Sequence, residues 1–419
     1  MATAERARIG RTAEAESRRE PPPRIPWHLA VVSHKLCWRS EDSPTGYATD
    51  GGFPMQMRAI SQLFESTTLV VPVAGDGPIP TGLQALSGPG MTIRPLSLPG
   101  GAGWRRKARL PFWLARNGPI LIQEIRKARA VHAPIPGDIG TLGMLIAHGL
   151  RKPLFVRHCG NWFVQTTAAE RFWRWYMERF AGGRKVMLTT GGALQAPSAR
   201  NPAVSWIFST SLTAGELEAR AQRRHHPRTD APRLLIACRQ DEEKGSGIVV
   251  RALPEILRHL PGATLEVLGD GPELSKFRAI AEQLSLSERV TFRGRVNHSE
   301  VLEAMARGDV FVYPTAASEG FPKVVLEALA SGLPVISTNV SVIPVLLAQG
   351  GGIVLPSRQP HEVAARVVEL WSDPARYESM SQAAIQSVQS YSLERWRDTI
   401  GDRLVSAWMP LPLIGDRAS

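Results

Sequence analysis

Short apolar runs alternate along the chain with stretches whose apolar residues recur at helical spacing, starting at about His28. In the first half the strand-like runs are LAVVSH, TTLVVPV, ARAVHAPI, PLFVRHC and KVMLT, and helices are expected from about Phe53 to Phe64 and from about Gly140 to Gly149. A second series of strands and helices runs from RLLIACR to PVIST. Strands that alternate with helices form parallel sheets, so the pattern predicts two doubly wound α/β domains in tandem, each similar to a Rossmann fold.

Polar segments predict where these domains begin and end. Residues 1–25 are rich in Arg and Glu and are expected to be a disordered tail. The stretch from Gly191 to Arg228, rich in Ser, Ala, Pro and Arg, marks the join. We expect an N-terminal domain over residues 26–205, completed by a C-terminal helix over residues 391–415, and a second domain over residues 206–390. Ligands are expected in a cleft between the two facing domains, at the C-terminal ends of the strands.

Composition narrows the class of protein. With 419 residues, 43% of them hydrophobic and 21% charged, the chain is too large for a small binding module and too apolar for global disorder. No run approaches the 18 or so apolar residues of a spanning helix, and the N-terminus has no apolar signal-peptide region, so we expect a cytoplasmic protein. Cys37, Cys159 and Cys238 are far apart and are expected to be reduced thiols.

Charge is distributed unevenly. Residues 1–215 hold 27 Lys+Arg and 13 Asp+Glu, a net +14, whereas residues 216–419 hold 23 and 25, a net −2. Residues 101–200 alone hold 17 basic and 4 acidic residues, interleaved with aromatic ones. This mixture favours an anionic surface, and the alternative is a solvated basic face. We expect a membrane surface, at the inner face of the plasma membrane, and no nucleic-acid partner.

The segment from Ser318 to Ala328, SEGFPKVVLEA, directly follows the strand VFVYP. Pro322 suits a first helical position, so we expect a helix from about Phe321 to Ser331. Glu319 then lies at the strand-to-helix turn and Glu327 about two turns into the helix. Eight helical positions separate two side chains by about 12 Å along the axis and by about 80°. That span matches the two ends of a sugar nucleotide, with the diphosphate over the helix N-terminus. The alternative is two solvated glutamates.

The chain resembles the retaining glycosyltransferases of family 4, which have the GT-B fold. Their signature is a pair of glutamates eight positions apart, followed by EAxAxGxPVI. In this chain the signature comprises Glu319, Glu327, Ala328, Ala330, Gly332, Pro334, Val335 and Ile336. The segments CRQDEEKG (238–245) and GDGP (269–272) match two further family elements. The likeness covers nearly all of residues 28–400. One departure is Val345, which stands where the family usually has a glutamate that contacts the donor sugar.

Two cations of the second domain are candidates for the diphosphate. Arg239 and Lys244 follow the strand RLLIACR, at the carboxyl edge where a ligand would bind. They would neutralise a diphosphate leaving group without a metal ion. The alternative is that they only balance the acidic residues between and beside them. The chain has no Asp-x-Asp arrangement and no His/Cys/Asp cluster at ligand spacing, so we expect no metal site and no metal dependence.

The resemblance adds further site residues. Gly51 and Gly52 match the family's glycine pair before a helix, where backbone amides approach phosphate. His158, at the end of PLFVRH, resembles the family's strand-end histidine beside donor sugar and acceptor, whereas His132 is expected to be structural. Two further groups are expected to contact the donor. Arg295 and Val296 lie in the segment whose backbone contacts the base in the family, and Gly320, Phe321 and Pro322 directly follow Glu319.

The resemblance implies transfer of a hexosyl or related sugar from a nucleotide-diphosphate donor to an acceptor hydroxyl, with retention. In the front-face route the leaving diphosphate takes the acceptor proton. Glu319 would hold the donor-sugar hydroxyls and Glu327 the ribose. We expect a UDP-sugar in preference to a GDP- or ADP-sugar, no further cofactor, and a carbohydrate or lipid-linked acceptor in lipid-linked or surface polysaccharide or glycoconjugate synthesis.

Two other functions fit part of the sequence. A nucleotide-sugar 2-epimerase also has two facing Rossmann-like domains, but it lacks the glutamate pair. A non-catalytic basic adapter that binds membrane or nucleic acid through residues 101–200 would leave the second half unexplained. Release of a nucleotide diphosphate from a panel of donors separates the three.

Overall fold

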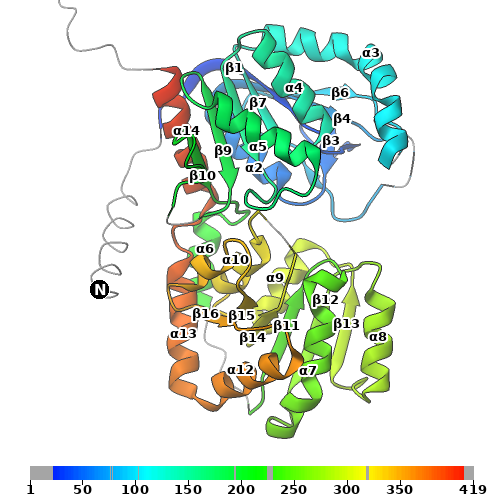
Figure 1. The fold of residues 1–419 in the computed structure, drawn as a ribbon, viewed down its shortest axis with the longest axis vertical. Helices are drawn as coiled ribbons and strands as arrows, with labels where there is room; N and C mark the ends of the chain where they lie inside the picture. Colours follow the sequence, from blue (N-terminus) through cyan, green and yellow to red (C-terminus); the bar gives the residue numbers. More distant parts are fainter. Residues whose placement is uncertain are drawn as a thin grey trace, which may run out of the picture. The chain divides into compact units, whose positions relative to one another are not determined.

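The computed structural model describes residues 22–75, 77, 79–101, 103–192, 195–223, 230–317 and 320–409. The expected tail, apart from its last four residues, therefore lies outside the described residues. The described chain forms two compact units (Figure 1). We call them the N-terminal unit, which runs to Ser211 and resumes at Leu393, and the C-terminal unit, which spans Leu212–Ser392.

A seven-stranded parallel sheet forms the centre of the N-terminal unit, in the order β10-β9-β8-β7-β1-β4-β6. Its inner strands are nearly continuous apolar runs because helices cover both faces. β1 begins at Ile25, the last residue of the expected tail, because that side chain is fully buried and its N–H donates to the Leu63 carbonyl at 2.8 Å. The strands are β1 (Ile25–Val32), β4 (Phe64–Pro72), β6 (Met91–Leu96), β7 (Ala130–Ile135), β8 (Leu154–His158), β9 (Lys185–Thr190) and β10 (Val204–Ile207).

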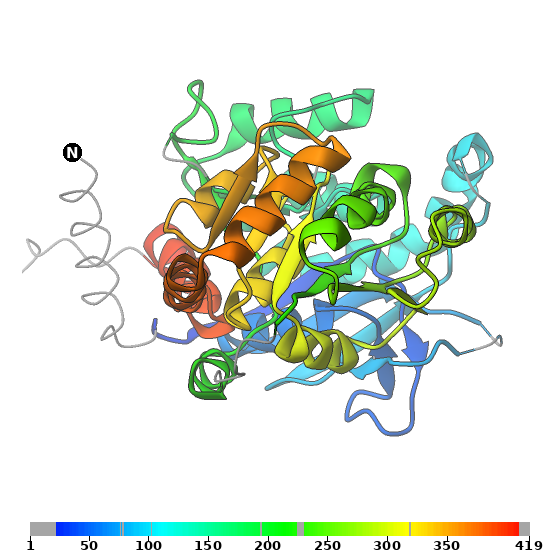
Figure 2. The same ribbon diagram turned by 90° about the horizontal axis from the view of Figure 1, so that it is seen from below.

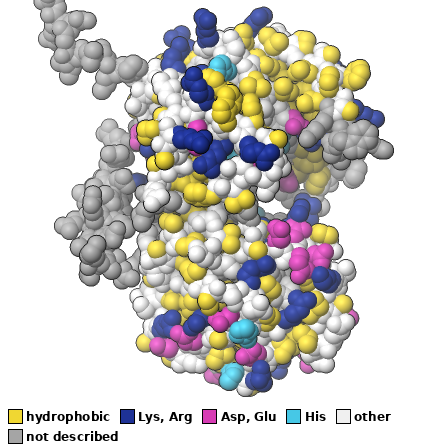
Figure 3. All heavy atoms as spheres, in the orientation of Figure 1, with side chains coloured by type: hydrophobic (Ala, Val, Ile, Leu, Met, Phe, Trp, Pro, Cys, Tyr) yellow, Lys and Arg dark blue, Asp and Glu magenta, His cyan; other side chains and the backbone are white. Residues whose placement is uncertain are grey.

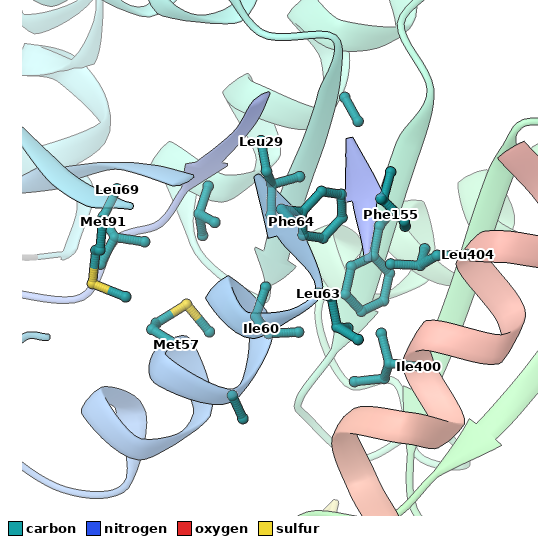
Figure 4. Packing of buried hydrophobic residues seen from close by; sticks show 14 of the residues in the cluster. Leu29, Met57, Ile60, Leu63, Phe64, Leu69, Met91, Phe155, Ile400 and Leu404 are labelled. Carbon is teal, nitrogen blue, oxygen red and sulfur yellow. The ribbon is translucent and has the colours of Figure 1, made fainter. Parts of the chain in front are cut away.

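One face of this sheet is covered by two helices from opposite ends of the chain, α2 (Phe53–Gln62) and α14 (Leu393–Trp408). Along α14, Trp396, Ile400 and Leu404 recur every four residues and are fully buried. Figure 4 shows Ile400 and Leu404 beside Leu63 and Phe155 in this core. The helix expected over 391–415 is thus described to Trp408, and residues 410–415 lie outside the description.

The other face carries α3 (Gly103–Lys127), α4 (Asp138–Gly149) and α5 (Ala168–Phe180). A small antiparallel sheet joins β2 (Trp38–Arg39), β3 (Tyr47–Thr49) and β5 (Gln84–Ala85). No helix in the described part of the chain is long and apolar enough to span a bilayer.

The C-terminal unit is built on a six-stranded parallel sheet in the order β13-β12-β11-β14-β15-β16. Its strands are β11 (Arg233–Ala237), β12 (Thr264–Leu268), β13 (Val290–Gly294), β14 (Val310–Tyr313), β15 (Val335–Thr338) and β16 (Gly352–Leu355). Figure 2 shows helices on both sides of this sheet. They are α6 (Ala214–Arg223), α7 (Ser246–His259), α8 (Leu274–Gln283), α9 (His298–Arg307), α10 (Lys323–Ala330), α11 (Ile343–Leu347), α12 (Pro360–Ser372) and α13 (Pro374–Ser387).

The helix of the glutamate motif begins later than expected. α10 starts at Lys323, and Pro322 is its N-cap residue, with φ −81° and ψ 89° outside the helical region. The expected start at about Phe321 is therefore wrong by two residues. Pro322 lies just before the first helical residue instead of being the first helical residue itself. Ser331 caps the C-terminal end, and Gly332 follows with a φ of 70°.

Candidate functional site

A cavity of about 730 Å³ opens at the carboxyl ends of β11, β12 and β13 in the C-terminal unit. The order of the sheet reverses between β11 and β14, and ligands of open α/β sheets bind at such a point. Helices α9 and α10 complete its wall. The cavity is lined by Ala237, Cys238, Arg239, Leu268, Gly269, Asp270, Gly271, Arg295, Val296, His298, Val301, Val324 and Glu327.

Two strand-end loops are locked together beside the cavity. The fully buried Gln240 side chain donates through Nε2 to the carbonyls of Cys238 (2.9 Å) and Leu268 (3.0 Å). Gly269 has a φ of 111°, and a Cβ there would lie 1.9 Å from the Cys238 carbonyl oxygen. Only glycine fits, because the two backbones touch. This contact shapes the edge of the cavity at which the diphosphate is expected.

Lys244 lies in a short 3₁₀ turn, η1 (Glu242–Lys244), that is docked on the loop after β14. The Ala316 N–H donates to the Glu243 carbonyl at 2.7 Å, and the Arg358 guanidinium donates to the carbonyls of Pro314 (2.8 Å) and Glu243 (3.1 Å). The Lys244 ammonium lies 3.4 Å from the Tyr313 hydroxyl, and burial lowers the pKa of Lys244. A half-buried cation is thus held at the carboxyl edge of the sheet, although Lys244 is not among the residues that line the cavity.

Arg239 is held more loosely. Its side chain is 73% exposed, and its guanidinium forms an ion pair with the Asp241 carboxylate. The hydrogen bond to Asp241 raises the pKa of Arg239. The sequence left open that Arg239 only balances neighbouring acidic residues, and the structure does pair it with one of them, Asp241. Arg239 also lines the cavity, and its guanidinium has further N–H donors besides the one bound to Asp241.

Glu327 lies on α10 with its side chain only 8% exposed. Its carboxylate Oε1 is 2.9 Å from Nε2 of His298, the first residue of α9. The hydrogen bond to Glu327 raises the pKa of His298, against the effect of burial. A carboxylate and an imidazole therefore share one wall of the cavity.

The structure brings four of the expected site residues around the cavity, namely Arg239, Arg295, Val296 and Glu327. Gly320, Phe321 and Pro322 are buried in the loop before α10 and are not among its lining residues; the Phe321 ring lies 6.2 Å from that of Tyr391. Glu319 lies outside the described residues. The helical spacing expected between Glu319 and Glu327 is wrong, because residues 320–322 are not helical and Glu327 lies only four residues after the start of α10.

The remaining expected residues belong to the N-terminal unit. Gly51 has a φ of 69° and Gly52 is the N-cap residue of α2. His158 ends β8, is 3% exposed and has its ring edge-on to Trp162 at 5.6 Å. Burial lowers its pKa to about 4. His132 is fully buried, stacks on Phe155 and has its Nδ1 3.0 Å from the Phe155 carbonyl, which fits a structural histidine.

Within the described residues, no three His, Cys, Asp or Glu side chains are grouped closely enough to hold a metal ion. Cys37, Cys159 and Cys238 form no disulfide. The absence of metal dependence stays a prediction.

The protein is doubly wound α/β, and its cavity lies at the carboxyl ends of parallel strands in the second half of the chain. Residues 218–387 match the family model of the glycosyl transferases group 1. The match lies within the C-terminal unit and confirms the expected resemblance to glycosyltransferases. The assignment to family 4 stays a prediction.

Two curated relatives and one solved structure are also similar to this chain. A "GDP-mannose-dependent alpha-(1-6)-phosphatidylinositol monomannoside mannosyltransferase" of Mycobacterium tuberculosis is 34% identical over 195 residues, 44% of this chain and 50% of the relative. The match thus spans about half the length of that relative. "Alpha-D-kanosaminyltransferase" of Streptomyces kanamyceticus is 27% identical over 72% of this chain and 82% of the relative. The Anabaena protein HepE, solved with UDP, has a TM-score of 0.63 at 15% identity, covering 90% of this chain and 99% of HepE. With the two parallel α/β units, this confirms the expected GT-B fold class.

Sequence reasoning missed His298 as a site residue. The available signal was its place at the start of a helix directly after a parallel strand, preceded by Asn297 as a capping residue. Such positions lie at the ligand-binding edge of the sheet. Its partner Glu327 is 29 residues further along the chain, so only the fold reveals the pair.

Proposed function

We propose that the protein is a retaining glycosyltransferase that moves a hexosyl or related sugar from a nucleoside-diphosphate sugar to an acceptor hydroxyl. The observation that carries this proposal is the cavity at the switch point of the C-terminal sheet, which both Glu327 of the glutamate motif and Arg239 line. It lies within the part of the chain that matches the glycosyl transferases group 1.

Each site residue has a part in this proposal. Glu327 accepts hydrogen bonds from the ribose, and the cavity segment Arg295–Val296 lies against the base. Arg239 and Lys244 stabilise the charge that develops on the leaving diphosphate. Glu319, by its place in the motif, contacts the donor sugar. In the N-terminal unit, the backbone amides of Gly51 and Gly52 contact a phosphate of the donor, and His158 lies beside the donor sugar and the acceptor. The leaving diphosphate takes the proton of the attacking hydroxyl.

The donor is the part to test first. The sequence favoured UDP, and HepE was solved with UDP, whereas the mycobacterial relative is named for GDP-mannose. The purified chain is incubated with UDP-glucose, UDP-N-acetylglucosamine and GDP-mannose, with sugar and lipid acceptors, and nucleoside diphosphate release and product are measured. Transfer with the donor's anomeric configuration kept, determined by NMR, is the expected result. Inversion, or no release from any donor, contradicts the proposal.

Metal independence is a separate part of the proposal. Two protein cations, Arg239 and Lys244, lie near the expected diphosphate, which is the role that a divalent ion plays in metal-dependent transferases. We expect turnover to persist in EDTA. Loss of turnover in EDTA that magnesium or manganese restores would overturn this part alone.

We also propose that the N-terminal unit docks on an anionic membrane and takes its acceptor there, as a peripheral protein at the cytoplasmic face. Along α3, Arg109, Phe112 and Arg116 are exposed at spacings of three and four residues, and Phe112 is 79% exposed. Such residues share one face of a helix. Figure 3 shows hydrophobic side chains gathered over the helices of this unit, with Lys and Arg around them.

A second helix repeats the arrangement. On α5, Arg171, Trp175 and Arg179 are exposed at four-residue spacing, and Trp175 is 54% exposed. An exposed aromatic ring between two arginines is typical of a helix at a membrane surface, where the ring enters the interface and the guanidinium groups meet anionic headgroups. By contrast, Arg106 is paired with Asp138 at 2.9 Å and is less available for this role.

A further inference from the structure

His298 is fixed in the cavity wall by the start of α9. The Asn297 side chain accepts a hydrogen bond from the Glu300 N–H at 2.9 Å, and the Glu300 carboxylate accepts one from the Asn297 N–H at 2.8 Å. This reciprocal capping box determines where the helix begins. Because His298 is the first helical residue, its imidazole is held at the edge of the sheet where the cavity opens.

The His298 imidazole stabilises the Glu327 carboxylate, whose burial without a partner would be unfavourable. Among the described residues, His298 is the only hydrogen-bond or ion-pair partner of the Glu327 carboxylate, through Nε2 and Oε1. A charged group that is 8% exposed is destabilising unless it is paired. The pair also fixes the direction of the Glu327 side chain, which lines the cavity.

The charged groups around His298 come from two helices. Glu327 and Lys323 lie on α10, and Glu216 lies on α6. The hydrogen bond to Glu327 raises the pKa of His298, burial lowers it, the charges of Glu327 and Glu216 raise it and that of Lys323 lowers it. The net result is a pKa above the ordinary value of 6.5, so the imidazole keeps its proton to a higher pH than a free histidine does.

We propose that His298 is a positioning residue for the nucleotide part of the donor: it holds the Glu327 carboxylate against the cavity, where that carboxylate accepts the hydroxyls of the ribose. This inference rests on the proposed function and assigns a residue to the same site. It has a second consequence, because the imidazolium also places a positive charge beside an anionic ligand.

The pH dependence of donor binding follows from both effects. When His298 loses its proton, the ion pair becomes a hydrogen bond between a neutral imidazole and the carboxylate, which is weaker, and the cavity loses one positive charge. Both changes disfavour the bound nucleotide. The affinity for a nucleotide sugar therefore falls as the pH rises through the raised pKa of His298.

Isothermal titration of the full chain with UDP-glucose and with GDP-mannose, from about pH 5.5 to about pH 8.5, tests this. Both phosphates of these probes are esterified, so the probes keep their charge over this range. Wild-type protein is expected to bind the better probe several-fold more weakly at the high end. His298→Gln keeps an amide donor but has no titrating group, so its affinity should not change with pH. His298→Ala should bind about tenfold more weakly than wild type at low pH, because a hydrogen bond to a charged group is lost.

His361→Gln is the matched control. His361 lies near the start of α12, 3.7 Å from the Glu362 carboxylate, and is 66% exposed and outside the cavity wall. This variant should keep the wild-type pH profile. The unfolding temperature of each variant, and of His298→Gln in particular, shows whether the variant is folded. In steady-state kinetics of His298→Gln, the KM for the donor should change more than kcat.

The outcomes separate this inference from the proposed function. A pH profile of His298→Gln that equals that of wild type, or wild-type affinity that rises with pH, overturns the role of His298 even if sugar transfer is observed. The expected profile without sugar transfer to any acceptor supports the role of His298 and contradicts the proposed function. Failure of both probes to bind wild-type protein overturns both.

Discussion

At the residue scale, Lys244 and Glu327 are held in ways that suit different steps. Lys244 is half-buried beside Tyr313 and would act on the leaving diphosphate, whereas Glu327 is paired with His298 and would act on the ribose. We expect Lys244→Ala to lower kcat about 10²-fold or more, as loss of one fixed cation at a developing charge does. Glu327→Gln should mainly raise the donor KM, about tenfold, since a ribose contact is made in the ground state too.

Steady-state kinetics on folded variants check these two expectations. Lys276→Ala is the control, because the Lys276 ammonium is paired with Glu242 and Glu273 on the surface and does not line the cavity. Wild-type rates in Lys244→Ala, with circular dichroism unchanged, would remove that residue from the site.

Two buried histidines make the N-terminal unit sensitive to acid. Burial lowers the pKa of His132 to about 3 and that of His158 to about 4. Both are near 6.5 in the unfolded chain, so between these values the unfolded state binds more protons. The free energy of unfolding is therefore full above about pH 6.5 and falls as the pH drops, by about 3 kcal/mol for His158 alone at pH 4.

Urea unfolding at several pH values, followed by tryptophan fluorescence, measures this loss. All of the 11 tryptophans except Trp371 belong to chain segments of the N-terminal unit, so the signal reports mainly on that unit. His158→Gln should lose less stability than wild type between about pH 6.5 and about pH 4, whatever its stability at neutral pH. An equal loss in both proteins would show that His158 is protonated in the folded state.

At the scale of elements, the strands with continuous apolar runs were predictable and the elements defined by tertiary contacts were not. β11, β12 and β15 lie within the runs RLLIACR, TLEVLGD and PVIST. The two- and three-residue strands of the small antiparallel sheet are too short to show any alternation. α3 contains Pro111 and Pro119, which normally end a helix, and it persists because Trp113, Leu121 and Ile125 pack into the core.

The same distinction holds for the candidate site. Arg239, Arg295, Val296 and Glu327 belong to local motifs, and the cavity includes all four. The helix start was misplaced because the proline rule gives the first turn only within a residue or two. His298 was missed because its role depends on a partner on another helix, and a single sequence carries no signal for such a pair.

The contact between the two strand-end loops gives an element-scale prediction. Gly269→Ala adds a Cβ 1.9 Å from the Cys238 carbonyl, so the loop must move away from Gln240 and the cavity edge changes. We expect at least a tenfold loss of nucleotide-sugar affinity in calorimetry, together with lower stability. Gly46→Ala is the matched control, since Gly46 has a φ of 77° but open space at the Cβ position. It carries only the left-handed backbone cost, about 1 kcal/mol. Equal behaviour of the two variants would show that the loop contact is not required.

At the scale of the whole chain, charge divides the molecule: residues 1–215 carry a net +14 and residues 216–419 a net −2. In the N-terminal unit, α3 and α5 each present an exposed aromatic ring between two arginines, whereas exposed basic and acidic side chains alternate along much of the C-terminal unit (Figure 3). Each arginine near an anionic leaflet contributes about 1 kcal/mol to membrane binding. We therefore expect the chain to co-sediment with vesicles that contain anionic lipid and much less with neutral ones.

The vesicle test needs a variant that changes the proposed face and one that changes only the net charge. Replacing Arg109, Arg116, Arg171 and Arg179 by Ser removes the arginines beside both aromatic rings, and we expect at least a tenfold weaker partition. Replacing four exposed arginines of the C-terminal unit by Ser lowers the net charge equally and should have little effect; these are Arg251, Arg258, Arg289 and Arg307. Binding should also weaken with salt, because the screening length falls from about 8 Å at physiological ionic strength to about 3 Å at 1 M. Equal losses in the two variants would show that binding depends only on the net charge. Equal binding to neutral and anionic vesicles would contradict the membrane proposal and indicate a soluble acceptor.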